Sequence, residues 1–314
     1  MTSPLLTQPR PASDGSQVGD PGRAWLAAMY RGDWPVAWAI NDSVLAAKDA
    51  ATRDDPRRPY HERWVWDGRP LRGRVLVRCY HGLGDTLQFW RYVAPLAAQA
   101  DVTAEVQPEL IPLLSGPGLL GSSVPLIPFD PAHPAAPCHD IEIMELPHAL
   151  RLPPSPTPYL SVAPLALDLP RPVIGVCWAA GGWEAARSVP WPLLTPLGRL
   201  GSVVSLQRGG DPAAPWPDPL GCSMDVATTA RLLMACDHVV TVDTMVAHLA
   251  GALGRPTSVL LRADADWRWM RERDDSPWYA ATRLYRQPAP GDWATPVARL
   301  ICDIAGNSAG CGGL

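Results

Sequence analysis

Residues 74–98, RVLVRCYHGLGDTLQFWRYVAPLAA, decide the fold of this chain. An apolar strand-like run is followed by a turn with two glycines, and then by apolar residues at helical spacing. Asp85 stands where that helix begins, between Gly84 and Thr86. A carboxylate at this place can cap the helix, belong to a cofactor loop or act as a catalytic group.

Strand-like and helical patterns alternate along the chain in two series. Apolar strands that alternate with helices predict parallel sheets covered on both faces. A proline-rich stretch, 151–172, separates the series, which predicts two Rossmann-like domains facing each other. Open α/β sheets bind ligands outside the carboxyl ends of their strands, so we expect the site in the cleft between the domains. The strand-like runs are 74–80, 102–107, 124–129 and 139–145, then 173–179, 202–207, 238–243 and 257–262.

Other segments flank this pair of domains. The first residues are rich in Pro, Ser and Gly, which is typical of disorder. After them, Asp33 and Pro35 are placed to cap and start the second helix of a hairpin. The predicted division is a disordered tail at 1–20, a helical hairpin and connector at 21–70, Rossmann-like domains at 71–160 and 161–305, and a flexible tail at 306–314.

Composition limits the classes of function. The chain has 314 residues, of which 47% are hydrophobic and 18% charged, as in a folded globular protein. A net charge of -4 leaves no basic footprint, so we expect no nucleic-acid partner. Lys48 is the only lysine, which argues against Schiff-base chemistry and leaves anion contacts to arginine, histidine or a helix N-terminus.

Targeting and redox signals favour a cytoplasmic protein. The N-terminus has no charged segment followed by a long apolar run, so it does not read as a secretory signal. No window of about 18 apolar residues is present, and we expect no membrane span. The cysteines are scattered without a C-x-x-C pair, a pattern that indicates reduced thiols.

The turn after the first strand allows two interpretations. Gly82 and Gly84 permit close backbone approach to a ligand, but Leu87 stands where a dinucleotide fingerprint has its third glycine. Glu105 lies about 20 residues on, where a ribose-binding acid would stand, so a nicotinamide site stays open. Asp85 as a plain helix cap is the other interpretation.

The second series carries groups suited to an anion. Arg187 and Ser188 precede a proline-started helix, and an arginine beside a helix N-terminus can hold a diphosphate. Asp243 and Thr244 open a later helix that carries His248 in its second turn. The alternatives are a solvated loop arginine, a helix cap and a half-buried histidine that packs in the core.

Aromatic residues and arginines crowd the stretch DADWRWMRERDDSPWY, residues 264–279. Such a cluster can stack on a base or on a sugar face. Packing at an internal interface is the other interpretation.

Several stretches, taken in order, resemble the C-terminal glycosyltransferase region of bacterial tetratricopeptide-repeat proteins. The resemblance covers about residues 30–305. The chain is more distantly similar to glycosyltransferase family 9, the ADP-heptose:lipopolysaccharide heptosyltransferases, through the pattern D-T-x-x-x-H-L-A. The stretches are GDWPVAWAI, WVWDGRPLRGRVLVRCYHGLGDTLQFWRYVAPLA, SVPWPLLTPL, VSLQ, VDTMVAHLAGALGRPTSVLL, DWRWM, DSPWY and LYRQPAPGDW.

The resemblance implies the GT-B fold, with the acceptor on the N-terminal domain and a nucleotide-sugar on the C-terminal domain. It implies no metal and no cofactor besides the nucleotide-sugar co-substrate. Asp85 would be the catalytic base and Arg187 would contact the donor phosphates. Asp243, Thr244 and His248 would contact the donor sugar and diphosphate.

Further candidates follow from their place beside these residues. His81 is predicted to assist catalysis or to orient the acceptor. The donor side also includes Ser188 and Gln207, and the turn on the acceptor side includes Gly82, Gly84, Thr86 and Gln88.

The chain departs from its relatives at a few positions. Met245 replaces the glycine that heptosyltransferases have after the Asp-Thr pair, which bears on donor identity. Tyr80 and His81 replace an acidic residue and a glutamine that are common in the tetratricopeptide relatives. The repeat array is reduced to one helical hairpin.

The sequence therefore predicts an inverting, metal-independent GT-B glycosyltransferase. It would move a sugar from a nucleotide-sugar to a hydroxyl of a glycan, protein or small-molecule acceptor. Two rivals stay open: a noncatalytic binding or scaffolding protein of the same fold, and a nicotinamide-dependent oxidoreductase built on residues 82–105.

Overall fold

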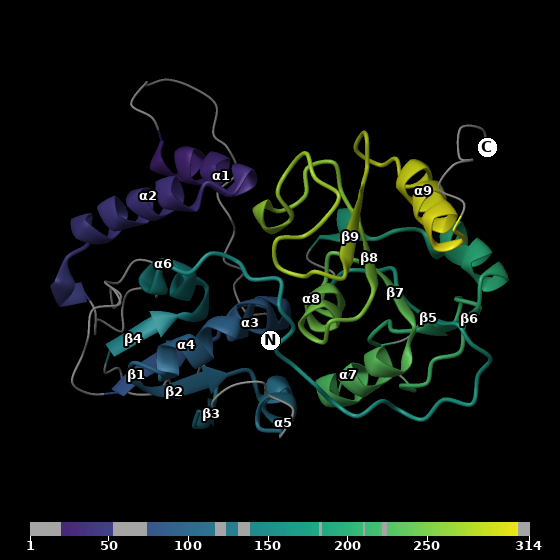
Figure 1. Cartoon of the computed structure of the whole chain (residues 1–314), viewed down its shortest axis with the longest axis horizontal. Helices are drawn as coiled ribbons and strands as arrows, with labels where there is room; N and C mark the ends of the chain where they lie inside the picture. The colour runs from purple at the N-terminus through teal and green to yellow at the C-terminus, as the bar shows by residue number, and fades with distance from the viewer. Residues whose placement is uncertain are drawn as a thin grey trace.

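Two parallel sheets lie side by side, with helices between them and around them (Figure 1). The predicted tails at 1–20 and 306–314 lie almost wholly outside the described residues, as does most of the predicted connector. The structure is a computed structural model and describes residues 20–52, 74–116, 124–130, 139–181, 184–209, 211–221 and 225–306.

The N-terminal sheet has the strand order β3-β2-β1-β4, and its neighbouring strands pair in parallel. The predicted strands are confirmed, with ends that differ by a few residues. In the described residues short helices follow β1, β2 and β4, because parallel strands need crossovers. The elements are β1 (Arg74–Arg78), α3 (Leu83–Phe89), η3 (Trp90–Tyr92), α4 (Val93–Ala97), β2 (Asp101–Val106), η4 (Pro108–Leu110), α5 (Ile111–Leu114), β3 (Leu126–Pro128), β4 (His139–Glu142), η5 (Ile143–Glu145) and α6 (Leu146–Leu150).

The C-terminal sheet has the order β6-β5-β7-β8-β9 and is also parallel. The last strand was not predicted, because its two arginines break the apolar pattern. The proline-started helix is a 3₁₀ helix, since Pro192 and Pro196 remove backbone donors. The elements are β5 (Val173–Cys177), η6 (Ala185–Arg187), η7 (Trp191–Arg199), β6 (Ser202–Ser205), α7 (Val226–Ala235), β7 (His238–Val242), α8 (Met245–Ala252), β8 (Thr257–Leu261), η8 (Trp267–Trp269), β9 (Thr282–Arg286) and α9 (Ala294–Ile304).

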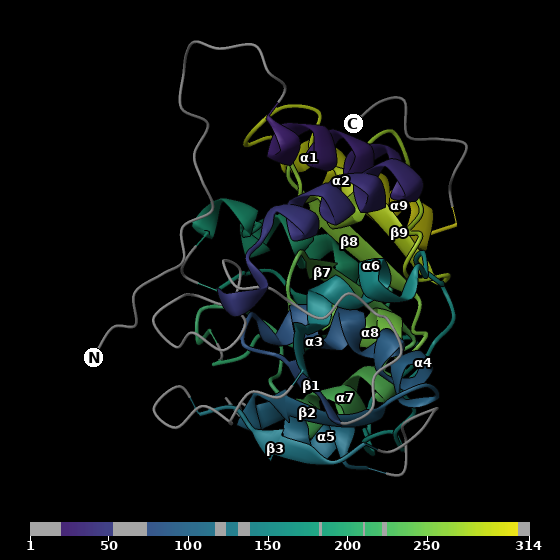
Figure 2. The ribbon, with the colours of Figure 1, turned by 90° about the vertical axis from the view of Figure 1, so that its left-hand side faces the viewer.

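The N-terminal hairpin consists of α1 (Pro21–Arg31) and α2 (Trp34–Ala47), with η1 (Ala50–Thr52) after it. Asp33 caps α2 as predicted, accepting a hydrogen bond from the Val36 amide at 3.4 Å. Figure 2 shows the hairpin beside the C-terminal loops.

Aromatic contacts hold the hairpin against the loop around η8. The Trp25 and Trp267 rings lie 5.4 Å apart, centroid to centroid, and the Tyr30 hydroxyl donates to the Ala265 carbonyl at 3.0 Å. The hairpin is therefore packed onto the body of the protein.

The two sheets meet where α3 packs against α8, and Figures 1 and 2 both place these helices together. Gly84 makes the contact close: a Cβ there would lie 2.9 Å from Cδ2 of His248 and 3.4 Å from Cα of Met245. Arg91 adds a second link, because it donates to the Trp278 carbonyl at 2.7 Å while its guanidinium lies over the Tyr159 ring. Both contacts join the N-terminal domain to the C-terminal domain.

The helices and the cysteines bear on the predictions of no membrane span and of reduced thiols. None of the helices in the described part of the chain has the length and apolar character needed to cross a bilayer. Cys79, Cys177 and Cys236 are free and buried. Cys302, however, is disulfide-bonded, so the prediction of reduced thiols is wrong for this residue.

Candidate functional site

Asp85 lies at the start of α3 and at the domain interface. Its Oδ2 accepts a hydrogen bond from the Gly82 amide at 3.0 Å, so the residue does help to cap its helix. Its Oδ1 accepts a second bond, at 2.7 Å, from Nη2 of Arg268 in the C-terminal domain. Asp85 therefore combines a capping role with an ion pair between the two domains.

Arg268 is the partner that sequence reasoning missed. Its Nη1 donates to Asp266 at 2.9 Å, and the guanidinium lies 4.7 Å from the centroid of the Trp267 ring. Burial alone would lower the pKa of this guanidinium, but the charges of Asp266 and Asp85 outweigh burial and raise it. Arg268 thus places a fixed positive charge opposite the turn that carries Asp85.

His81 forms an acid–base cluster on the other side of the turn. Its Nε2 contacts Oε1 of Glu142, and the Tyr80 hydroxyl donates to Oε2 of the same carboxylate at 3.1 Å. Burial alone would lower the pKa of His81. The neighbouring carboxylates of Glu142 and Asp85 outweigh burial and raise it. Glu142, which sequence reasoning missed, stands at the carboxyl end of β4. A polar residue at the end of an apolar strand is the sequence signal that could have identified it as a site residue.

The remaining turn residues point inward. Thr86 donates to Oε1 of Gln107 at 2.9 Å, and Nε2 of Gln107 donates to the His81 carbonyl at 2.8 Å. Gln88 is fully buried, so the structure places it behind the turn and not at its open face. Gly84 packs on α8 as described above. These predicted acceptor residues hold the shape of the turn that presents His81 and Asp85.

Arg187 ends η6, in the loop that follows β5 in the C-terminal domain. Its Nη1 donates to the Asp243 carbonyl at 3.0 Å and lies 3.6 Å from Oδ2 of Asp243. Its Nε lies 3.3 Å from Oε2 of Glu184, whose other oxygen contacts Arg262. The side chain of Arg187 is 16% exposed, so it is held by partners and is not a solvated loop arginine.

The other predicted donor residues shape the loop after β5 and the start of α8. Ser188 accepts from the Ala180 amide at 3.0 Å, and Oε1 of Gln207 accepts from the Ala179 amide at 2.9 Å. The Thr244 hydroxyl caps α8 by accepting from the Val246 amide at 3.2 Å. Ser188 and Gln207 therefore fix the loop that lies beside Arg187.

Asp243 lies between the charges around Arg187 and those around Arg268. Burial and the charge of Asp266 raise the pKa of its carboxyl, while Arg187 and Arg268 act in the opposite direction. Carboxylates and guanidiniums therefore alternate from Asp85 through Arg268 to the start of α8. The structure brings the predicted catalytic and donor residues to one interface.

His248 is largely internal. Its Nδ1 hydrogen-bonds with the Tyr279 hydroxyl at 2.9 Å, and its ring stacks on Trp269 with 5.4 Å between centroids. Burial, together with the charges of Arg268, Arg91 and Arg187, lowers its pKa to about 3. The imidazole is therefore neutral, and packing at the α3–α8 contact is its visible role.

The cluster at 264–279 is interface packing. Trp267 packs edge-on against Trp25 of the hairpin, and Trp269 and Trp278 are buried. Asp264 and Asp266, which form a D-x-D pair in sequence, contact Arg262 and Arg268. Among the described residues, no group of three or more His, Cys, Asp or Glu could hold a metal ion.

Glu105 does not have the role that a nicotinamide site requires. Its Oε2 accepts from Nη1 of Arg78 at 2.9 Å, and Nε of Arg78 donates to Asp140 at 2.8 Å. All three side chains are almost fully buried inside the sheet. The prediction that Glu105 could bind a ribose is therefore wrong, because the carboxylate neutralises an internal arginine.

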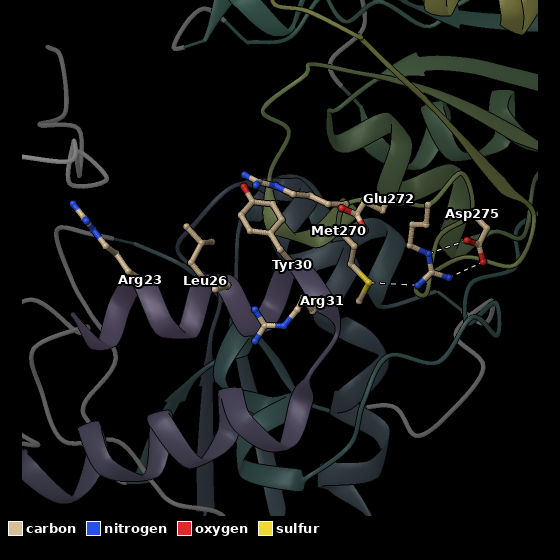
Figure 3. Close-up of a pocket in the computed structure, with 10 residues that line it drawn as sticks. Arg23, Leu26, Tyr30, Arg31, Met270, Glu272 and Asp275 are labelled. Atoms are coloured by element: carbon tan, nitrogen blue, oxygen red, sulfur yellow. Dashed lines mark hydrogen bonds and ion pairs between the residues drawn. The ribbon is translucent and has the colours of Figure 1, made fainter. Parts of the chain in front are cut away.

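A separate groove of about 750 Å³ lies between α1 and the loop at 270–275 (Figure 3). The Arg271 guanidinium lies 4.2 Å from the centroid of the Tyr30 ring, and Arg273 pairs with Asp275 at 2.6 Å. None of the predicted site residues lines this groove. We therefore place the candidate site at the α3–α8 interface.

Comparison with known proteins supports the architecture. No protein-family model matches the chain, and no curated protein matches it. E. coli ADP-heptose lipopolysaccharide heptosyltransferase II is similar in structure, with a TM-score of 0.53 and 17% identity over 75% of this chain and 98% of that one. This likeness shows a GT-B fold of two Rossmann-like halves.

Two other solved structures are similar at lower scores. The glycosyl transferase family 9 protein from Veillonella parvula DSM 2008 has a TM-score of 0.48 and 12% identity, covering 68% of this chain and 86% of that one. E. coli heptosyltransferase WaaC with ADP has a TM-score of 0.46 and 15% identity, covering 75% and 100%. The fold assignment rests on heptosyltransferase II, and the tetratricopeptide association stays a prediction.

The buried histidine gives a pH-dependent prediction. Folded His248 excludes a proton that the unfolded chain binds below its ordinary pKa of 6.5, so stability falls as the pH drops from there toward about 3. We expect His248→Gln to reduce the slope of unfolding free energy against pH by up to about 1.4 kcal/mol per pH unit. Urea unfolding between about pH 6 and about pH 4 measures both slopes. Equal slopes would show that His248 accepts a proton in the folded state.

Proposed function

We propose that this protein is an inverting, metal-independent glycosyltransferase that uses a nucleotide-sugar donor and an acceptor hydroxyl. One observation carries the proposal: the acid–base groups His81 and Asp85 lie across the domain interface from Arg187 and Arg268. A displacement at a sugar carbon needs both kinds of group, a proton acceptor for the attacking hydroxyl and positive charge for the leaving group. The GT-B fold supports the same reading as an analogy.

The C-terminal side is suited to a leaving nucleoside diphosphate. Arg187 supplies a permanent charge, and the positive end of the dipole of α8, which begins at Met245, lies beside it. Both would stabilise the negative charge that develops on the departing phosphate oxygen. Asp243, Thr244 and His248 would shape the pocket around the sugar and the diphosphate.

Arg187 is neutralised before any donor arrives. Glu184 bridges Arg187 and Arg262, so its carboxylate occupies a place between two guanidiniums that suits a phosphate. A donor diphosphate would displace Glu184 from Arg187. Arg187 would then exchange a carboxylate for a phosphate as its partner, while Glu184 would keep its contact with Arg262.

A donor screen tests the function directly. We expect the protein to release nucleoside diphosphate from one of the ADP-, UDP- or GDP-sugars, and to bind NAD no better than a nonspecific ligand. Release should persist in excess EDTA, because Arg187, Arg268 and the α8 N-terminus take the role that a metal would have at the diphosphate. A requirement for Mg²⁺ or Mn²⁺ would contradict the metal-free assignment. Tight nucleotide binding without release from any donor would favour the scaffolding alternative.

Calorimetry with the matching diphosphate tests the donor site. Arg187→Ala should weaken binding by roughly 1.5–3 kcal/mol, the scale of a charge-assisted hydrogen bond. Glu184→Gln should strengthen it by up to about 1 kcal/mol, because a competing carboxylate is removed from a partly exposed ion pair. Asp264→Asn is the matched control, since Asp264 contacts Arg262 without contacting Arg187. Unchanged affinity in Arg187→Ala places the donor elsewhere.

A further inference from the structure

We infer that His81 is the group that removes the proton from the acceptor, that Glu142 orients it, and that Asp85 positions Arg268. This inference rests on the proposed function and decides between the two acid–base candidates of the same turn. Asp85 is the base that the family resemblance implies. The contacts of the two residues favour His81.

Asp85 already uses both of its oxygens. Oδ2 accepts from the Gly82 amide and Oδ1 from Nη2 of Arg268. An acceptor hydroxyl would have to compete with these two donors for the carboxylate oxygens of Asp85. Its side chain also lies at the domain contact, where removing it would leave Arg268 with one carboxylate partner, Asp266. These contacts suit a residue that fixes the position of a charge.

His81 has the arrangement of a general base. Nε2 contacts the Glu142 carboxylate, which fixes the proton on that nitrogen and leaves the lone pair on Nδ1. Among the described residues no group hydrogen-bonds to Nδ1. The side chain is 31% exposed, so an acceptor hydroxyl can reach it. Oε1 of Glu142 is buried and has no hydrogen-bond partner in the described structure, and Nε2 of His81 is the basic group in contact with it.

The charges around His81 come from every element packed against it. Tyr80 precedes it in the same loop and donates to Glu142, which ends β4. Asp85 lies on α3, and Arg268 lies on η8. Two carboxylates favour the protonated imidazole and one guanidinium opposes it. The net effect raises the affinity of His81 for a proton, which is the property that a base near neutral pH requires.

The step is a single displacement. The acceptor O–H bond breaks and its proton goes to Nδ1 of His81, while the oxygen lone pair forms a bond to the anomeric carbon. The bond from that carbon to the phosphate oxygen breaks, and its electron pair leaves with the nucleoside diphosphate. Glu142 stabilises the imidazolium that forms, and Arg268 and Arg187 face the departing charge.

The first test measures the proton affinity of His81 without substrate. Glu142→Gln removes the charge that favours the imidazolium, so the pKa of His81 should fall when it is followed by NMR titration. Glu142→Asp should restore much of the shift. Asp42→Asn is the matched control, because Asp42 pairs with a different histidine, His148, at 2.9 Å. An unchanged His81 titration in Glu142→Gln would overturn the role of Glu142.

The second test follows diphosphate release from the nucleotide-sugar that the donor screen identifies. His81→Asn should lower turnover by about 10²–10⁴-fold, the range for loss of a general base. Glu142→Gln should lower it less and move the acidic limb of the pH–rate profile to lower pH, a shift that a purely structural residue does not cause. Asp85→Asn should weaken turnover and move the acidic limb less than Glu142→Gln does, because Asp85 contributes less than Glu142 to the charge around His81.

The outcomes separate the two levels of the proposal. If wild-type protein releases no diphosphate from any donor, the proposed function fails and the inference fails with it. If His81→Asn keeps most of the wild-type turnover while Asp85→Asn loses it, only the inference is overturned, and Asp85 is the base.

Discussion

The close approach of α3 to α8 at Gly84 is the constraint on which the site depends. A side chain at this position would meet the ring edge of His248 and the backbone of Met245, so only glycine allows the two helices this separation. Because each helix begins at the carboxyl end of a parallel strand, their contact turns the two functional edges toward each other. The resulting interface contains the acid–base turn on one side and the arginines on the other.

Charge compensation explains how such an interface stays folded without a ligand. Arg268 is shared by Asp85 and Asp266, and Arg187 by Asp243 and Glu184. Each guanidinium is largely buried, and a buried charge without a partner would cost several kcal/mol. The same pairings would let the site respond to a donor, because a phosphate can replace a carboxylate as the partner of an arginine.

The sequence allowed the fold to be predicted better than the site. Continuous apolar runs and the glycine turn at 82–84 indicated the parallel strands. β9 was not predicted, because arginines at its second and last positions interrupt the apolar pattern. Asp85 could be placed at a helix start from its neighbours alone. Its partner Arg268 is 183 residues away, and Glu142 lies on a different strand from the His81 turn, so no local signal joined them. Glu105 was wrongly predicted as a ribose-binding residue for the same reason. The spacing from the glycine turn does not reveal that Glu105 pairs with the buried Arg78 on the neighbouring strand.

Hydrogen exchange in the presence of the donor nucleotide-sugar tests the central claim most directly, because it locates the ligand without assuming a catalytic residue. Backbone amides that become ordered by a ligand exchange more slowly. The account predicts protection on both sides of the interface, at residues 81–86 in the N-terminal domain and at 184–188 and 243–248 in the C-terminal domain. Protection confined to α1 and to the loop at 270–275, with none at those three segments, would contradict it.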